Sequence, residues 1–149
     1  MSPTNPEPLS TSILLIDGSK NQRTYWAEKL KHSSPDYLVL EAEDCESARA
    51  IFRSRRIDCI VLDLALPDQE GFKLLVELVR VASRPQVAVV VLTHIAEREV
   101  WGLAKDNGAY ACLAKQFTTG EDLDRTIQRA MAFVGQMPKE DRHRPTSSL

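Results

Sequence analysis

The sequence of 149 residues is poor in cysteine and contains no CxxC pair. Its three cysteines, Cys45, Cys59 and Cys112, are odd in number and far apart along the chain. A disulfide framework needs paired cysteines, and a structural zinc site needs closely spaced ligands. The spacing argues against both, and we interpret the three cysteines as reduced structural thiols.

Long apolar stretches and an excess of one charge are also absent. The longest uninterrupted apolar run is Val87–Leu92, whereas a membrane-spanning helix needs about 20 apolar residues. Residues 1–8 contain no basic region followed by an apolar stretch, so they do not resemble a secretory signal. The 19 basic and 21 acidic residues give a net charge of −2 and no general attraction to nucleic acid. We therefore expect a cytoplasmic protein without contacts to membrane or nucleic acid.

The residues that are present are typical of one soluble globular domain. Hydrophobic residues make up 43% and charged residues 27% of the chain, which is an ordinary globular composition, and the length favours a single domain. Prolines and polar residues gather at both ends. We expect a disordered N-terminal tail at 1–11, a folded domain at 12–136 and a polar C-terminal tail at 137–149.

Short runs rich in valine, isoleucine and leucine alternate with segments of helical periodicity. Strands are predicted at 13–17, 37–43, 57–63, 87–93 and 110–115. In the helix predicted at about 96–107, Val100, Leu103 and Ala104 form the inward stripe and Trp101 lies off it. The alternation predicts an α/β fold with a five-stranded parallel sheet and helices on both faces, because right-handed crossovers place helices there.

Polar residues end four of the five predicted strands. Asp17, Asp63, Thr93 and Lys115 stand at the carboxyl ends of the first, third, fourth and fifth strands. Each alone has an ordinary explanation as a turn residue, a helix cap or a solvated charge. Functional groups of open α/β sheets collect beyond these strand ends. We therefore expect the four side chains to converge in one crevice.

This combination of groups suits phosphoryl chemistry. Two clustered carboxylates repel each other and favour a hard divalent cation such as Mg²⁺. A cation and an ammonium group together neutralise phosphoryl oxygens, and a carboxylate can form an aspartyl phosphate. A hydroxyl within reach can bond a new phosphate oxygen and convert the covalent event into a loop movement.

The pattern resembles the receiver domain of two-component response regulators. The resemblance runs from about residue 13 to 134 and is carried by segments 13–17, 60–67, 91–93 and 108–117, together with Gly71. It implies a doubly wound, flavodoxin-like fold and a signalling function without enzymatic activity of its own.

The resemblance also implies roles for individual residues. Asp63 matches the phosphoacceptor, Thr93 the hydroxyl that switches, and Lys115 the lysine that pairs with the phosphoryl group. Asp17, Asp63 and the backbone carbonyl of Ala65 match the ligands of Mg²⁺.

Four positions depart from the family pattern. Gly18 stands where a second acid usually follows the first strand, which predicts weaker Mg²⁺ binding. Gln116 replaces the proline after the lysine, and we expect a trans peptide bond there because a cis bond before a non-proline residue costs about 2.5–4 kcal/mol. Cys112 replaces an aromatic residue that moves with the hydroxyl, and His94 replaces a small residue.

Several functions remain open at this stage. The leading hypothesis is a receiver that accepts a phosphoryl group from a histidine kinase or phosphotransfer protein. Too few residues follow 136 for an output domain, so the output would pass to a downstream protein. The expected contact surface is formed by the fourth helix, fifth strand and fifth helix. The chain could also form a homodimer or be a fragment of a larger regulator. The alternative is a pseudo-receiver that binds partners without phosphorylation. An aspartyl phosphatase is disfavoured by Ala65, and a dinucleotide-binding enzyme by the absence of a GxGxxG motif after the first strand.

Overall fold

The computed structural model describes residues 10–68, 70–81 and 87–135 and contains one five-stranded parallel sheet in the order β2-β1-β3-β4-β5. The elements in chain order are β1 (Thr11–Ile16), α1 (Lys20–Ser33), β2 (Tyr37–Ala42), α2 (Cys45–Ser54), β3 (Cys59–Leu62), α3 (Gly71–Val81), β4 (Ala88–Thr93), α4 (Arg98–Asp106), β5 (Ala111–Ala114), the 3-10 turn η1 (Lys115–Phe117) and α5 (Gly120–Gly135). The predicted α/β class and the doubly wound sheet are confirmed. Residues 1–9 and the tail predicted at 137–149 lie outside the described residues.

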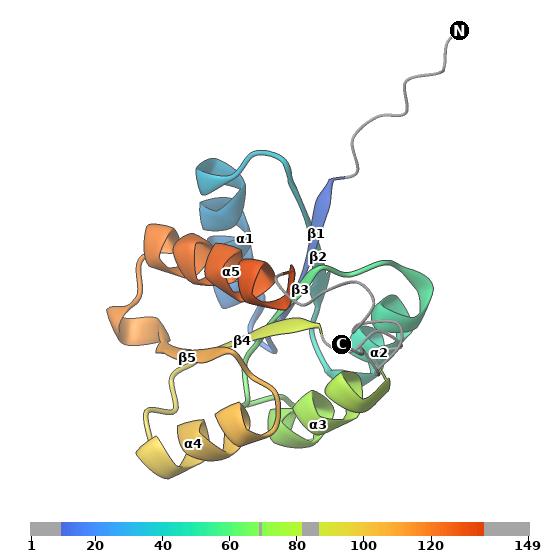
Figure 1. Cartoon of the computed structure of the whole chain (residues 1–149), viewed down its shortest axis with the longest axis vertical. Coiled ribbons are helices and arrows are strands. Elements are labelled where there is room, and N and C mark those ends of the chain that lie inside the picture. The colour runs from blue at the N-terminus through green and yellow to red at the C-terminus, as the bar shows by residue number, and fades with distance from the viewer. Residues whose placement is uncertain (1–9, 69, 82–86, 136–149) are drawn as a thin grey trace, which may run out of the picture.

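The sheet separates two hydrophobic layers (Figure 1). Alternate residues of a strand point to opposite faces, so in β1 Leu14 and Ile16 pack with α2, α3 and α4, whereas Ile13 and Leu15 pack with α1 and α5. Burial on both faces explains why these strands are almost continuously apolar. In the described part of the chain, no helix is both long and apolar enough to span a bilayer.

Helix α1 begins a few residues after the end of β1. Ser19 is its N-cap, and its side-chain oxygen accepts a hydrogen bond from the backbone amide of Gln22 at 3.3 Å. Such a cap satisfies one of the free amides of the first helical turn. The serine cap predicted from the sequence therefore fixes where the chain turns immediately after Asp17.

Helix α4 shows a different inward face from the predicted one. Leu103 is 53% exposed, while Trp101 is partly buried against the core together with Val100 and Ala104. The Nε1 of Trp101 donates a hydrogen bond to the backbone carbonyl of Ile95 at 2.7 Å. The prediction that Leu103 faces inward and Trp101 lies off the stripe is therefore wrong, because the large indole ring packs against the core and its N–H finds a partly buried acceptor in the carbonyl of Ile95.

Helix α3 begins in direct contact with the segment that follows β3. A Cβ atom on Gly71 would lie 2.7 Å from the carbonyl oxygen of Asp63 and 2.7 Å from the Cα of Leu64. The amide of Gly71 also donates a hydrogen bond to the carbonyl of Leu64 at 2.8 Å. Only glycine permits this approach without displacement of the backbone, so Gly71 sets the distance between α3 and the end of β3.

Candidate functional site

Three of the predicted site residues are in direct contact. Asp17 follows β1, Asp63 follows the neighbouring strand β3, and Lys115 begins η1 after β5. The Nζ of Lys115 donates to Asp17 Oδ2 at 2.6 Å and to Asp63 Oδ2 at 2.9 Å. The side chains of Lys115 and Asp17 are each 3% exposed and that of Asp63 is 9% exposed. One buried ammonium therefore bridges two buried carboxylates.

The second oxygen of each carboxylate is held by the backbone of its own loop. Asp17 Oδ1 accepts a hydrogen bond from the amide of Ser19 at 2.8 Å, and Asp63 Oδ1 accepts one from the amide of Ala65 at 3.1 Å. The guanidinium of Arg23 donates to the backbone carbonyl of Asp17 at 2.8 Å. Hydrogen bonds to a charged carboxylate oppose the cost of its burial, so these contacts orient both groups toward Lys115.

Thr93 lies at the end of β4, the strand next to β3, and is completely buried. Its Oγ1 accepts a hydrogen bond from the amide of Ile95 at 3.3 Å. Within the described residues its hydroxyl makes no hydrogen bond to Asp17, Asp63 or Lys115. The structure thus places Thr93 on the same edge of the sheet as the ion-paired cluster, with its hydroxyl engaged locally.

Comparison with known proteins identifies the family of the chain. The model of the response regulator receiver domain matches residues 13–128, which is most of the chain. The chain belongs to the response regulator receiver domain family. Members of this family are generally signalling modules rather than enzymes.

Relatives of this receiver domain include longer proteins. It is 28% identical over 120 residues to the transcriptional regulatory protein PdtaR of Mycobacterium tuberculosis, and the match covers 80% of this chain and 56% of that protein. The chain thus spans about half the length of that relative. Other relatives are protein-glutamate methylesterases, of which the chain covers 25–30%.

Solved receiver structures share the fold. The CheY-like receiver domain protein of Methanospirillum hungatei superposes with a TM-score of 0.78 at 21% identity, covering 87% of this chain and 100% of that chain. The Mn²⁺-bound form of response regulator Rcp1 superposes with a TM-score of 0.68 at 26% identity, covering 86% of this chain and 96% of that chain.

Receiver domains generally bind Mg²⁺ in an acidic pocket, and the donors present here fit such an ion incompletely. Asp17 and Asp63 supply two hard carboxylates, as Mg²⁺ prefers. No group of three or more acidic, histidine or cysteine side chains suited to a metal occurs in the described residues. Gly18 contributes no ligand, and a Cβ atom there would lie 3.0 Å from Cδ of Pro67. A bound ion would therefore depend on two carboxylates, a backbone oxygen and water.

Two of the departures from the family pattern contact each other, which sequence reasoning missed. The Nδ1 of His94 lies 3.2 Å from Gln116 Oε1, and Gln116 Nε2 lies 3.4 Å from the carbonyl oxygen of His94. The two residues are 22 positions apart, so no local spacing could indicate the contact. No cis peptide bond occurs in the described residues, which confirms the trans bond predicted between Lys115 and Gln116.

Cys112 occupies a buried position beside helix α4. Its Sγ lies 3.8 Å from the backbone carbonyl of Trp101. Burial raises the pKa of the Cys112 thiol to about 11, so the thiol is uncharged at neutral pH. The contact is consistent with the predicted structural role of a reduced cysteine.

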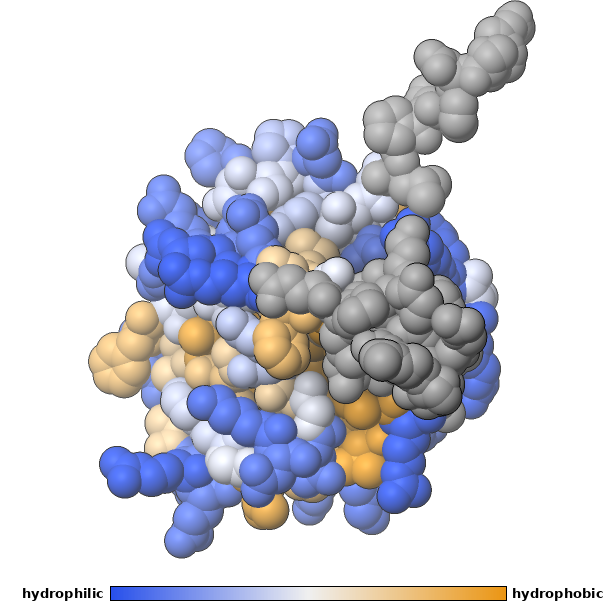
Figure 2. Space-filling model, in the orientation of Figure 1, coloured by the Kyte–Doolittle hydropathy of each residue, from blue (hydrophilic) through white to orange (hydrophobic). Residues whose placement is uncertain are grey.

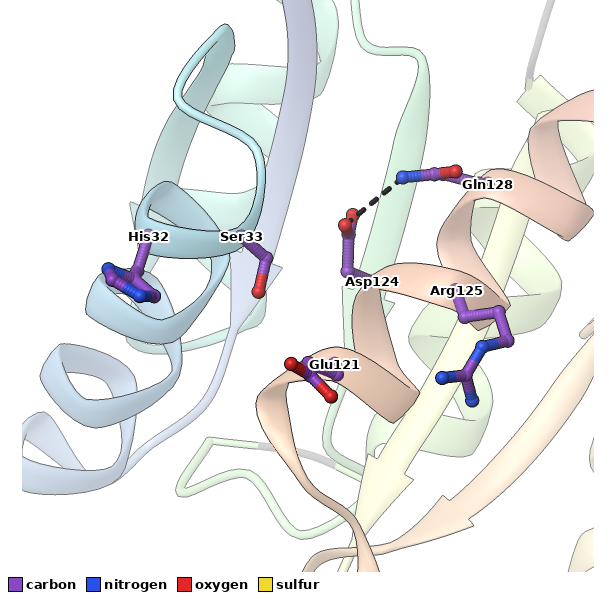
Figure 3. A pocket seen from close by; sticks show the side chains of 6 residues that line it. All are labelled: His32, Ser33, Glu121, Asp124, Arg125 and Gln128. Atoms are coloured by element: carbon purple, nitrogen blue, oxygen red, sulfur yellow. Dashed lines mark hydrogen bonds between the residues drawn. The ribbon is translucent and has the colours of Figure 1, made fainter.

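A separate polar pocket lies between α1 and α5 (Figure 3). It is lined by His32, Ser33, Glu121, Asp124, Arg125 and Gln128. Buried Asp124 accepts hydrogen bonds from Tyr37 Oη at 2.5 Å, Ser34 Oγ at 2.9 Å and Gln128 Nε2 at 3.0 Å. Burial and the hydrogen bond to Asp124 raise the pKa of Tyr37 well above its ordinary value. This carboxylate is saturated by neutral donors, and we interpret it as structural.

Proposed function

We propose that this receiver domain is a phosphoacceptor that takes a phosphoryl group onto Asp63 from a histidine kinase or phosphotransfer protein. The observation that supports this most is the buried bridge from Lys115 to Asp63 at 2.9 Å and to Asp17 at 2.6 Å. In the transfer, a carboxylate oxygen of Asp63 forms a bond to phosphorus while the bond from phosphorus to the donor breaks. The electron pair of the broken bond leaves with the donor.

Each neighbouring group has a part in this proposal. Lys115 stabilises the charge of the incoming phosphoryl oxygens because its ammonium already lies beside Asp63 in a site with little water. Thr93 exchanges its hydrogen bond with Ile95 for one to a phosphate oxygen. Such an exchange converts the covalent event into a movement of the loop after β4.

Mg²⁺ is the cofactor of the proposed reaction, and Asp17, Asp63 and the carbonyl of Ala65 would hold it. When bound, the ion supplies positive charge that offsets the developing charge of the phosphoryl oxygens. We expect weak binding because Gly18 contributes no acid and because ligand charge sets affinity in such sites. Lys115 already neutralises one of the two carboxylate charges.

The proposed output surface is the face formed by α4, β5 and α5. Three large apolar side chains on it are exposed, with Leu103 at 53%, Tyr110 at 40% and Phe133 at 57%. The rings of Tyr110 and Phe133 are 5.7 Å apart, and Figure 2 shows apolar surface around β5, whereas much of α5 is hydrophilic. Exposed aromatic side chains are typical anchors of protein interfaces. The partner would be a downstream protein or a second copy of the chain, in the cytoplasm.

A second candidate function is a pseudo-receiver that binds partners without phosphorylation. It is favoured by the same bridge, since Lys115 offsets one of the two carboxylate charges with a group of the protein itself and no group of three or more metal-ligating side chains occurs in the described residues. In that case the Lys115 bridge would hold the loops together and Asp63 would have no acceptor role.

Incubation with acetyl phosphate and Mg²⁺ followed by intact-mass measurement separates the two candidates. We expect the wild type to gain the mass of one phosphoryl group and Asp63→Asn to gain none. Asp124→Asn is the matched control, because it neutralises a buried aspartate that lies outside the cluster of Asp17, Asp63 and Lys115 and should leave the mass gain intact. A folded wild type that gains no mass at any Mg²⁺ concentration would contradict the phosphoacceptor and support the pseudo-receiver.

A further inference from the structure

His94 and Gln116 connect the loop that follows Thr93 at the end of β4 with the 3-10 turn η1, which begins at Lys115. His94 follows Thr93 directly, and Gln116 follows Lys115 directly. The contact is reciprocal, since His94 Nδ1 lies 3.2 Å from the amide oxygen of Gln116 and the amide nitrogen lies 3.4 Å from the carbonyl of His94. Because an amide oxygen only accepts, the Nδ1 of His94 carries the proton in this pair.

The contact lies where the pairing of β4 with β5 stops. The final pair in the ladder is Thr93 with Ala114. Beyond this pair, β4 continues into a loop and β5 into η1. The side chains of His94 and Gln116 contact each other between these two segments. Because Lys115 is bonded to both carboxylates, this contact joins the segment of the hydroxyl to the segment of the ammonium.

The loop after β4 is fastened at two further points. The amide of Ile95 donates to Thr93 Oγ1 at 3.3 Å, and its carbonyl accepts from Trp101 Nε1 at 2.7 Å. When the Thr93 hydroxyl leaves Ile95, the loop next to His94 loses one of these two hydrogen bonds and keeps the one to Trp101. Both His94 and Gln116 are exposed, so their contact can break without uncovering the core.

We propose that His94 and Gln116 act as positioning residues that form a clasp holding the loops after β4 and β5 in their unphosphorylated arrangement. The proposal rests on the proposed phosphoacceptor function. A phosphoryl group on Asp63 draws the hydroxyl of Thr93 away from Ile95 and the ammonium of Lys115 away from Asp17. Both movements strain the contact between His94 and Gln116. The clasp consequently opposes phosphorylation, and it makes the segments after β4 and β5 move together.

The kinetic test is a double-mutant cycle on phosphorylation by acetyl phosphate. We expect His94→Ala and Gln116→Ala each to increase the rate by about threefold to tenfold, which corresponds to one or two exposed hydrogen bonds. The double variant should be no faster than either single variant, because one contact is lost in all three. His32→Ala removes an exposed histidine on α1 and should leave the rate unchanged. Slower phosphorylation, no change or additive effects would overturn the proposal.

A spectroscopic test does not depend on phosphorylation. In ¹⁵N NMR spectra the ring of His94 should carry its proton on Nδ1 in the wild type and lose that preference in Gln116→Ala, because the bond at one ring nitrogen sets the tautomer. His94→Ala should also shift the amide resonances of Lys115 and Gln116. If both signatures are absent, there is no clasp, whether or not Asp63 is phosphorylated.

A wild type that shows both signatures but gains no phosphoryl group would contradict the proposed function and confine the clasp to a structural contact. That result overturns the regulatory part of the inference. Phosphorylation with both signatures and a non-additive cycle supports the function and the clasp together.

Discussion

The described part of the chain buries carboxylates in two places, which are stabilised in different ways. At the carboxyl edge of the sheet, Asp17 and Asp63 share the ammonium of Lys115. Between α1 and α5, Asp124 is surrounded by the neutral donors Tyr37, Ser34 and Gln128. The pair of carboxylates is stabilised by a shared buried ammonium, and the single carboxylate of Asp124 by hydrogen bonds from neutral groups.

The difference shows why burial alone does not identify a reactive carboxylate. Asp124 has its oxygens occupied by hydroxyl and amide groups from three separate segments, which fixes α5 against the corner between α1 and β2. In Asp63, one carboxylate oxygen accepts a hydrogen bond from a loop amide and the other accepts one from Lys115. The same ammonium also donates a hydrogen bond to Asp17. A flexible lysine can follow a new anion, whereas a set of fixed donors cannot.

The largest effect should come from Lys115→Met, which leaves two buried carboxylates without their cation. We expect a loss of about 3 kcal/mol in the free energy of unfolding, as found when one partner of a buried ion pair is removed. Mg²⁺ should restore part of the loss, because both carboxylates become available to it. Urea unfolding with and without Mg²⁺ measures this, with Lys105→Met on the exposed face of α4 as control. Equal stability of the wild type and Lys115→Met would show that the bridge contributes nothing.

Tyr37→Phe tests the other carboxylate and should cost less. Loss of one donor to buried Asp124 predicts a destabilisation of about 2 kcal/mol at neutral pH. The pKa of Tyr37 is raised in the folded protein, so its contribution is complete below the ordinary tyrosine pKa of about 10 and is lost as the pH rises beyond it. Unfolding free energies of both proteins should therefore converge in alkaline solution. A constant difference between pH 7 and 11 would be incompatible with the hydrogen bond to Asp124.

Gly18→Asp should make the charged cluster more dependent on metal. A third acid beside Asp17 and Asp63 predicts roughly tenfold tighter Mg²⁺ binding, measurable through the fluorescence of Trp101. Because a Cβ at this position lies 3.0 Å from Cδ of Pro67, Gly18→Asn serves as control with the same size and no charge. Tighter binding in both variants would attribute the effect to geometry rather than to charge.

The smallest effect should come from the exposed carboxylate of Asp68, which serves as a reference for the two sites with buried carboxylates. Asp68 accepts hydrogen bonds from the amides of Cys45 and Glu46 at the start of α2, and the amide of Cys45 is the first cause that lowers the pKa of Asp68. Its contribution to stability is present above the ordinary aspartate pKa of about 3.9 and is lost as the pH falls through the lower folded value. Asp68→Asn should therefore differ from the wild type at pH 7 and match it in strong acid. A difference that persists in acid would argue against this role.

The sequence was sufficient to predict the sheet and the convergence of its polar ends. Apolar runs that end in Asp17, Asp63 and Lys115 are short-range signals, and parallel strands necessarily bring their ends to one edge. The roles of these residues in phosphoryl transfer stay predictions. The inward face of α4 was not predictable, because Leu103 and Trp101 are both large side chains and the hydrogen bond from Trp101 to the carbonyl of Ile95 forms only in the folded chain.

The contacts of polar side chains between distant segments were beyond sequence reasoning. Tyr37 and Asp124 are 87 residues apart, and His94 and Gln116 are 22 apart. His94 and Gln116 do follow strand ends, and Tyr37 begins β2, but no local spacing or periodic pattern associates the members of either pair. Such contacts depend on how the helices and loops are placed relative to the sheet.

The close approach at Gly71 has a mechanical consequence for the segment that carries Asp63. The backbone of Gly71 approaches the backbone of Asp63 directly, because a Cβ atom on Gly71 would lie only 2.7 Å from the carbonyl oxygen of Asp63. No flexible side chain therefore separates the two segments. A shift of the Asp63 carbonyl toward α3 would press directly on the backbone of Gly71. We therefore expect the segment that carries Asp63 and the first turn of α3 to move together.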